Sequence, residues 1–335
     1  MPTAVRTVMP RWVHALAVLT VVTALPLVLL GAEVTTRSVG MADPAGYRDP
    51  RYLWQSLGSL LGHFGVAGPW PGLAVEHAHR FVGMVVGVCC ILLAAATLLA
   101  VRHPWGRWVG CLALFMVSAQ GILGIFRVDL NALRGTELAL FHGLFAQLVL
   151  AVLVGVAVLT APAWWRGCDA DVRSLRVPAA LLSLLVYGQI VFGAVTRHLG
   201  AGWAQRLHVL FAFGVVAVVV WLVQAVRTGP GGRGPRVVLG LLCVLVLAQV
   251  SLGVEAWLRR FGTGDAVLGL TRDLKPTPTL NLVRSGHFVV GSALFVTTVV
   301  LNLLLYRPAA VGVAEPAAAP AAPVGAFAAR METVA

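Results

Sequence analysis

Eight runs of mostly apolar residues constrain this 335-residue chain more than any other feature of its sequence. The runs cover residues 12–31, 79–101, 107–126, 139–161, 177–196, 205–226, 236–257 and 284–306. A helix of about 20 residues matches the thickness of the bilayer's hydrocarbon core. Backbone inside lipid must satisfy its own hydrogen bonds, which helices do. The sequence therefore predicts an all-α integral membrane protein with eight transmembrane helices.

The overall composition supports the same fold class. Hydrophobic residues make up 59% of the chain and charged residues 11%, with a mean hydropathy of +0.88. Soluble domains carry roughly a quarter charged residues, so a soluble globular enzyme and a disordered chain are both excluded. The net charge is +12, but the arginines lie between apolar runs. We interpret them as helix-end anchors and ligand contacts, and expect no nucleic-acid partner.

Eight spans place both termini on one side of the membrane. Basic residues are nearly balanced between the two sides, but the short loops after the second, fourth and sixth runs are basic. The positive-inside tendency counts such short loops most, so both termini are predicted in the cytoplasm, with the protein in the cell's inner membrane. The long connections are 32–78 and 258–283. Residues 308–335 are rich in alanine and proline and are predicted to be disordered.

The apolar runs carry an internal repeat. Odd-numbered runs end on a frame in which glycine is the fifth residue: Leu27–Gly31, Gln120–Gly124, Gln189–Gly193 and Gln249–Gly253. Even-numbered runs begin near a histidine: His79, His142, His208 and His287. This is a helix pair repeated four times or a four-helix unit repeated twice, and it predicts two corresponding halves, residues 1–165 and 166–307.

The four repeated histidines are predicted to lie at a similar depth near the outer face. A histidine inside a membrane helix is a functional-site hypothesis by default, and the alternative is a hydrogen bond that joins neighbouring helices. Imidazole is a common axial ligand of heme iron. The repeated glycines then either leave clearance for the flat macrocycle or allow close helix packing.

Charged residues near these histidines suggest further roles. Heme propionates favour arginine partners, and the candidates are Arg80, Arg127, Arg197, Arg206 and Arg284, which could instead extend to lipid headgroups. Glu76 shares a helix face with His79 and Arg80. It is predicted to relay protons or stabilise positive charge beside a cofactor, unless it only pairs with Arg80. His63, His77 and His198 are interpreted as solvated loop residues, although His77, next to Glu76, could instead tune the site.

Several motifs together resemble the heme A synthase family over residues 10–306. They are ExxHR at 76–80 followed by FVG, His142 near a helix start, GAVTRHLGAG at 193–202, QRLH at 205–208 and GH at 286–287. The resemblance implies two pseudo-symmetric four-helix bundles, with a heme b cofactor between His208 and His287 of the C-terminal bundle and Arg206 and Arg284 nearby. It also implies that substrate heme o binds near His79 and His142, with Arg80 and Arg127 as contacts and Glu76 needed for turnover.

The reaction implied by the resemblance is oxidation of the C8 methyl group of heme o to a formyl group by successive hydroxylation, for cytochrome oxidase assembly. The implied partners are membrane lipids, a heme O synthase and an electron donor. Some family members carry a cysteine pair in the first outer loop, but residues 32–78 contain no cysteine. We expect the loop aromatics Tyr47, Tyr52, Trp54, Phe64 and Trp70 to form a lid over the N-terminal site instead.

Two other classes of protein remain open at this point. A b-type electron-transfer cytochrome would hold two permanent hemes and would not depend on Glu76. A transporter built on the same repeat would need discontinuous helices near mid-membrane, and Pro26 is the only candidate for such a break. Whether the chain forms a homo-oligomer is also left open.

Overall fold

The computed structural model describes residues 9–43, 48–49, 51–64, 71–164, 172–229, 232–261 and 277–307. The α-helices in these ranges are α1 (Arg11–Thr36), α2 (Tyr52–His63), α3 (Gly72–Ala100), α4 (Val109–Asp129), α5 (Asn131–Thr160), α6 (Arg176–Leu199), α7 (Gly202–Thr228), α8 (Arg233–Phe261) and α9 (Pro278–Leu305). A short 3-10 helix, Arg173–Leu175, precedes α6. All of the α-helices except α2 are long and apolar enough to cross a membrane. The predicted all-α fold with eight spans is confirmed.

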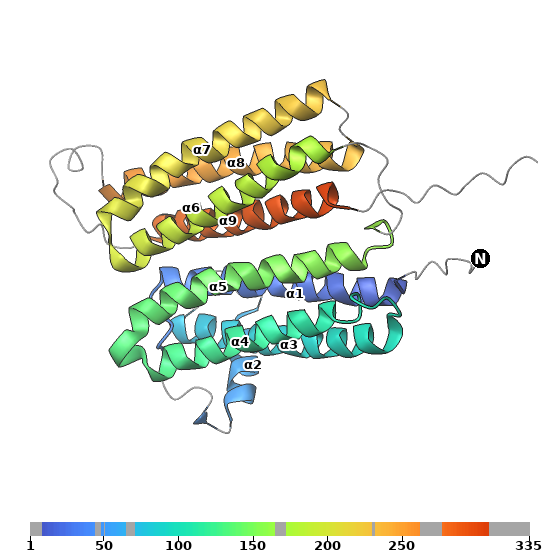
Figure 1. The fold of residues 1–335 in the computed structure, drawn as a ribbon. Coiled ribbons are helices and arrows are strands. Elements are labelled where there is room, and N and C mark those ends of the chain that lie inside the picture. The colour runs from blue at the N-terminus through green and yellow to red at the C-terminus, as the bar shows by residue number, and fades with distance from the viewer. Residues whose placement is uncertain are drawn as a thin grey trace, which may run out of the picture.

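The spanning helices form two groups that lie side by side (Figure 1). In the first group α1 packs on α3 and α5, and α4 packs on α3 and α5. In the second group α6 packs on α7 and α9, and α8 packs on α7 and α9. The groups meet where α9 contacts α1 and α5, and where α5 contacts α6. This arrangement is consistent with two four-helix bundles, and their pseudo-symmetry and exact division stay predictions.

Each group has its own cluster of buried apolar side chains. Leu93 and Leu153 lie in the cluster of the first group, and Leu182, Leu222 and Leu242 lie in the cluster of the second. These five leucines are almost completely buried. Because many other apolar side chains on the spans are exposed, the core is narrow and the outer surface suits contact with lipid.

The helices extend beyond the apolar runs at the end that carries the repeated histidines. His208 lies in the second turn of α7, His79 and His287 lie in the third turns of α3 and α9, and His142 lies in the fourth turn of α5. Each of these helices therefore begins three to eight residues before its apolar run. The apolar run stops at the first charged residue, whereas the helical backbone continues, because its hydrogen bonds do not depend on side-chain polarity.

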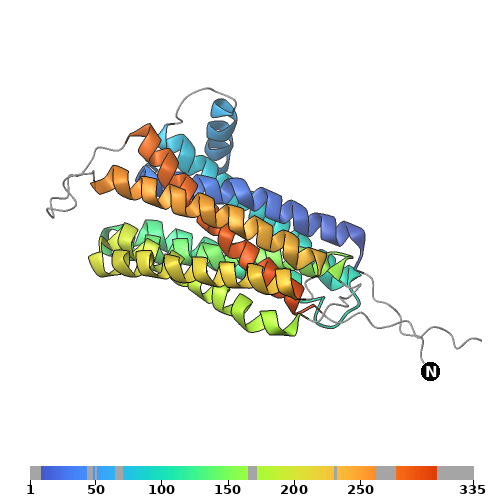
Figure 2. The same ribbon diagram turned by 90° about the horizontal axis from the view of Figure 1, so that it is seen from above.

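The first long connection, expected to be a loop, contains α2. This helix packs on α3 and lies crosswise to the spanning helices (Figures 1 and 2). Of the predicted lid aromatics, Tyr52 lies against Arg80, with the guanidinium carbon 5.8 Å from the ring centroid. Trp54 and Phe64 are 71% and 77% exposed among the described residues. Tyr47, Trp70 and the alanine- and proline-rich tail lie outside the described residues.

Candidate functional site

Each of the four repeated histidines packs against the glycine of the preceding spanning helix. An ideal Cβ placed on Gly31, Gly124, Gly193 or Gly253 would lie 3.0, 3.2, 3.1 or 3.1 Å from the imidazole Cε1 of His79, His142, His208 or His287, respectively. Such distances are tighter than ordinary van der Waals contact. The missing side chain therefore makes room for an imidazole ring, a role that the sequence analysis did not consider for these glycines.

The same frame also supplies a hydrogen-bond acceptor. The Nδ1 atom of His79 lies 3.2 Å from the backbone oxygen of Leu27, and that of His208 lies 2.9 Å from the backbone oxygen of Gln189. Each acceptor is four residues before the glycine, and a helical carbonyl points toward residue i+4. Glycine at that position leaves the carbonyl open to the ring.

This hydrogen bond selects the tautomer of the imidazole. A carbonyl only accepts, so Nδ1 carries the proton and Nε2 keeps its lone pair. Metal-ligating histidines commonly donate their other ring N–H to such an acceptor, which fixes the ring orientation. His79 and His208 therefore keep the lone pair of Nε2 free.

The glutamine side chains of the frame lie beside the other two histidines. The amide nitrogen of Gln120 lies 3.2 Å from both ring nitrogens of His142, and that of Gln249 lies 3.2 Å from Nε2 of His287. The amide oxygens of Gln120, Gln189 and Gln249 are buried and have no hydrogen-bond partner among the described residues. These three glutamines occupy the same position of the repeated frame.

His208 and His287 face each other across the second group of helices. Their ring centroids are 6.1 Å apart and their planes are inclined by 71°. An imidazole nitrogen binds a metal ion at about 2 Å. Two rings on opposite sides of one ion then have centroids roughly 6 Å apart. The spacing and the nitrogen donors of this pair fit the two axial positions of a heme iron.

The first group brings His79 and His142 into one electrostatic cluster. The two imidazoles are close enough to interact electrostatically, and the positive charge of Arg127 is close enough to affect both. Among the described residues, no group of three or more histidine, cysteine, aspartate or glutamate side chains is placed to hold a metal ion. The histidine arrangements in this structure are pairs.

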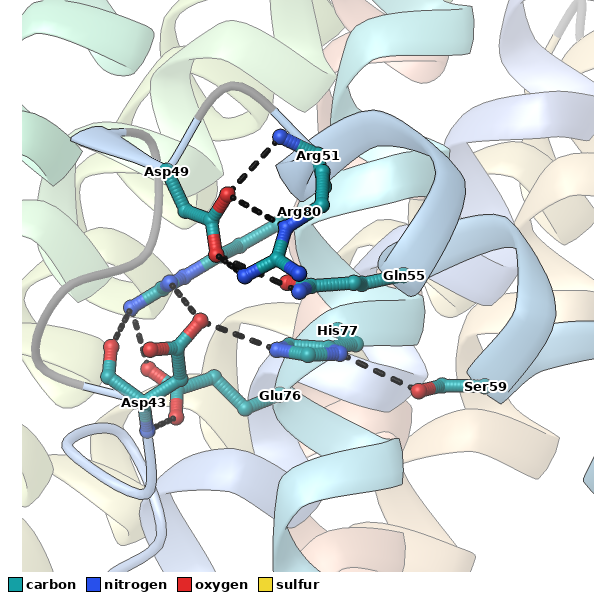
Figure 3. Close-up of polar contacts among 8 residues, drawn as sticks. All are labelled: Asp43, Asp49, Arg51, Gln55, Ser59, Glu76, His77 and Arg80. Atoms are coloured by element: carbon teal, nitrogen blue, oxygen red, sulfur yellow. Dashed lines mark hydrogen bonds and ion pairs between the residues drawn. The ribbon is translucent and has the colours of Figure 1, made fainter.

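Glu76 is buried beside this cluster, with 2% of its surface exposed. It forms an ion pair with Arg80, one turn further along α3. Its second carboxylate oxygen accepts the backbone N–H of Asp43 at 2.8 Å (Figure 3). The expected Glu76–Arg80 pair is thus present, and it lies inside the protein, where charges interact more strongly than in water.

Tyr52 of α2 covers the outer side of Arg80. Burial raises the pKa of the Tyr52 phenol. The ring therefore stays neutral at physiological pH and offers its π face to the guanidinium, a favourable contact.

The interpretation of His77 as a solvated loop residue is wrong. His77 lies in α3 and is 4% exposed. Its Nδ1 lies 3.1 Å from the hydroxyl of Ser59, and its Nε2 lies 3.0 Å from a carboxylate oxygen of Asp43. The reason is that α3 begins at Gly72 and α2 packs over this part of it. His63 and His198 are likewise helical, at the end of α2 and in α6.

The predicted arginines fall into different environments. Arg127 fills the space beside Gly40, and its Nε is buried without a hydrogen-bond partner in the described parts of the chain. Arg197 donates to the hydroxyl of Thr36 at 2.6 Å and acts electrostatically on Arg284 and His287. Arg206 is exposed at the start of α7. The structure therefore gathers Arg197 and Arg284 near the second histidine pair and leaves Arg206 at the surface.

A bulky residue at Gly253 is expected to displace His287. In Gly253→Val, the new Cβ would lie 3.1 Å from Cε1 of the imidazole, and its two methyl groups would crowd the ring further. We expect a roughly tenfold or larger loss of heme affinity, comparable with the loss of an outer-shell partner of a metal site. Heme content per protein after purification measures it. Gly240→Val is the matched control in α8, because nothing lies within 4 Å of its Cβ position. Equal heme content in both variants would contradict this role of Gly253.

The fold and site define a multi-pass helical membrane protein with histidine pairs near one end of its spans. Proteins named heme A synthase are similar in sequence. The one from Methylorubrum extorquens is 30% identical over 258 residues, which cover 63% of this chain and 64% of the relative. The one from Exiguobacterium sp. is 29% identical over 182 residues, or 53% and 57% of the two chains.

A third heme A synthase, from Shouchella clausii, is 24% identical over 284 residues, which cover 73% of this chain and 87% of the relative. The match spans slightly less than two thirds of the length of the Methylorubrum protein. No family model and no solved structure matches the chain. These similarities support the heme A synthase family for this chain.

Proposed function

We propose that this protein is a heme-dependent oxidoreductase that converts heme o to heme A for cytochrome oxidase assembly, by successive hydroxylation of the C8 methyl group to a formyl group. The observation that carries the proposal is the chemical difference between the two histidine sites. His79 has a buried carboxylate, Glu76, three residues before it on the same helix. The residue three positions before His208 is Gln205, and that before His287 is Arg284. Two sites of different chemistry suit a substrate and a resident cofactor.

In this proposal the second group of helices holds the resident cofactor. His208 and His287 would hold the heme iron through ring nitrogens, and the backbone oxygen of Gln189 keeps the His208 ring in the tautomer with a free Nε2. Arg197 and Arg284 supply positive charge for the propionates. Heme b bound there would supply one-electron transfer.

The first group receives heme o as substrate. His79 and His142 orient the macrocycle, and Arg80 and Arg127 attract its propionates. Glu76 relays protons or stabilises positive charge beside the bound heme, which is acid–base or electrostatic catalysis. Because Arg80 and the Asp43 N–H both bind its carboxylate, Glu76 acts from a fixed position.

The proposal also includes the location and orientation of the protein in the membrane. The protein spans the inner membrane with both termini in the cytoplasm, so the histidine-bearing ends of the spans lie toward the outer face. Heme o comes from a heme O synthase, and electrons come from a separate donor.

The direct test is to co-express the chain with a heme O synthase in a host that makes no heme A. Hemes extracted from the membranes are then identified by chromatography and mass spectrometry. We expect heme A in cells that carry the chain and only heme O and heme b in cells with the empty vector. Heme O without heme A in the first culture would refute the proposal, and two bis-histidine heme b spectra in the purified protein would then identify a b-type cytochrome.

A further inference from the structure

We propose that Asp43 and His77 are positioning residues that hold the carboxylate of Glu76 in its working direction. They do so by fixing the segment that follows α1, residues 37–43, which we call the strap. The catalytic part of this inference rests on the proposed function, but the structural part can be tested without it.

The strap passes over the end of the first group of helices. After α1 ends at Thr36 the chain turns at Ser38, whose φ is 58°. Val39 then packs on Gly72 at the start of α3, and Gly40 lies against the guanidinium of Arg127 from α4. A side chain on either glycine would meet these neighbours. The strap therefore follows a closely fitted path from α1 across to α3.

Asp43, at the end of the strap, contacts both members of the Glu76–Arg80 pair (Figure 3). Its backbone N–H donates to Glu76 at 2.8 Å, and its backbone oxygen accepts from Arg80 at 3.2 Å. Its carboxylate lies 3.7 Å from the other terminal nitrogen of Arg80. One residue outside α3 thus fixes both side chains of the pair, and its backbone must stay in place to do so.

His77 connects the strap to α2. The Asp43 carboxylate can only accept, so Nε2 of His77 carries the proton and donates to it at 3.0 Å. Nδ1 is then the acceptor for the Ser59 hydroxyl of α2 at 3.1 Å. His77 and Glu76 are neighbours on α3 and project in directions about 100° apart. His77 hydrogen-bonds the Asp43 carboxylate, and Glu76 accepts the Asp43 backbone N–H. A displacement of the Asp43 side chain therefore also displaces the N–H that binds Glu76.

Without this connection the carboxylate of Glu76 keeps only part of its binding groups. A buried carboxylate that loses a donor turns toward the donors that remain, here Arg80. The Glu76 carboxylate then loses the orientation that Arg80 and the Asp43 N–H together impose on it. Because displacements of about 1 Å in a catalytic group can cost 100-fold in rate, the strap contributes to turnover without touching the substrate.

The experiment compares His77→Leu with His77→Gln in the full-length purified protein. Leucine fills the space without hydrogen bonds, whereas the glutamine amide can donate to Asp43 and accept from Ser59. Hydrogen exchange of a peptide covering residues 37–43 is measured by mass spectrometry, together with kcat and KM for heme o. His63→Leu is the matched control, since its Nδ1 binds the backbone oxygen of Ser59 within its own helix.

We expect His77→Leu to speed exchange in the strap about tenfold and to lower kcat by about tenfold, with KM and resident heme content nearly unchanged. His77→Gln should restore both quantities toward the wild-type values, and His63→Leu should change neither. If His77→Leu does not fold, Ser59→Ala keeps the imidazole and is expected to speed strap exchange to a smaller extent.

Unchanged strap exchange in the folded variants, or equal effects of leucine and glutamine at position 77, would overturn the inference. The outcomes separate the two proposals. If the wild-type protein makes no heme A, the proposed function fails, and the exchange measurement still decides whether His77 and Asp43 hold the strap.

Discussion

His208→Ala and His287→Ala are each expected to yield purified protein that has lost its resident heme. Each substitution removes one of two facing imidazoles whose centroids are 6.1 Å apart. Removing an outer-shell partner of a metal ligand costs roughly 10–100-fold in affinity, and removing the ligand itself should cost more. Heme content per protein, from the pyridine hemochrome spectrum, should therefore fall to a small fraction of the wild-type value.

Two controls make this result specific. His14→Ala changes a histidine of α1 whose Nδ1 lies 3.3 Å from the Thr160 hydroxyl, near the opposite ends of the spans, and should leave the heme content unchanged. Added imidazole should restore the Soret band of His208→Ala, because a free imidazole can enter the vacated space. Normal heme content in both ligand variants would contradict the assignment of this pair.

The eight spans could be predicted because the bilayer imposes one physical length on every apolar helix. The residues at which the helices begin and end could not be predicted. At α3 the apolar run begins near His79, but the helix begins at Gly72, and this places Glu76 and His77 inside a regular helix. Polar residues at a membrane boundary are compatible with both a helix and a loop, so the sequence does not distinguish them.

The histidine–glycine contacts were partly visible in the sequence. The five-residue frame and the four histidines predict that the helix pairs are equivalent, but the glycines alone are compatible with clearance for a macrocycle or with close helix packing. The acceptor for His79 and His208 is a backbone oxygen, of Leu27 and Gln189. A backbone acceptor is present at every residue, so no residue type marks it. The glycine four positions later was the signal that could have revealed it.

Contacts between distant segments were the least predictable part of the site. Asp43 binds Glu76, Arg80 and His77 across more than 30 residues of chain, and α2 between them was expected to be loop. The same limit applies to the arginines. Arg197 and Arg206 are both near histidines in sequence, but only the direction of α6 and α7 brings Arg197 toward His287 and leaves Arg206 exposed.

Glu76→Gln is expected to abolish heme A formation while the protein keeps its resident heme. Glutamine keeps the size of the side chain and an oxygen that can accept from Asp43, but it carries no charge and is a poor proton acceptor. General acid–base groups contribute about 10²–10⁴-fold to rate, and the loss should fall in that range. Glu76→Ala should reduce formation at least as much, and it also removes the main partner of Arg80. Both substitutions remove the charge that pairs with Arg80, but glutamine keeps an acceptor oxygen for the guanidinium and for the Asp43 N–H and leaves no cavity, so the glutamine variant is the cleaner measurement.

This experiment distinguishes the formation of heme A from the binding of resident heme, since Glu76 lies in the first group of helices and the facing histidine pair lies in the second. Heme A is quantified in membranes that contain heme O, and resident heme is quantified in the purified variant. Glu255→Gln is the matched control, because Glu255 pairs with Arg259 at the same i, i+4 spacing on α8 and is exposed. A Glu76→Gln variant that makes heme A at the wild-type rate would show that the carboxylate is a structural partner of Arg80. Loss of both heme A and resident heme would show instead that the two sites depend on each other for folding.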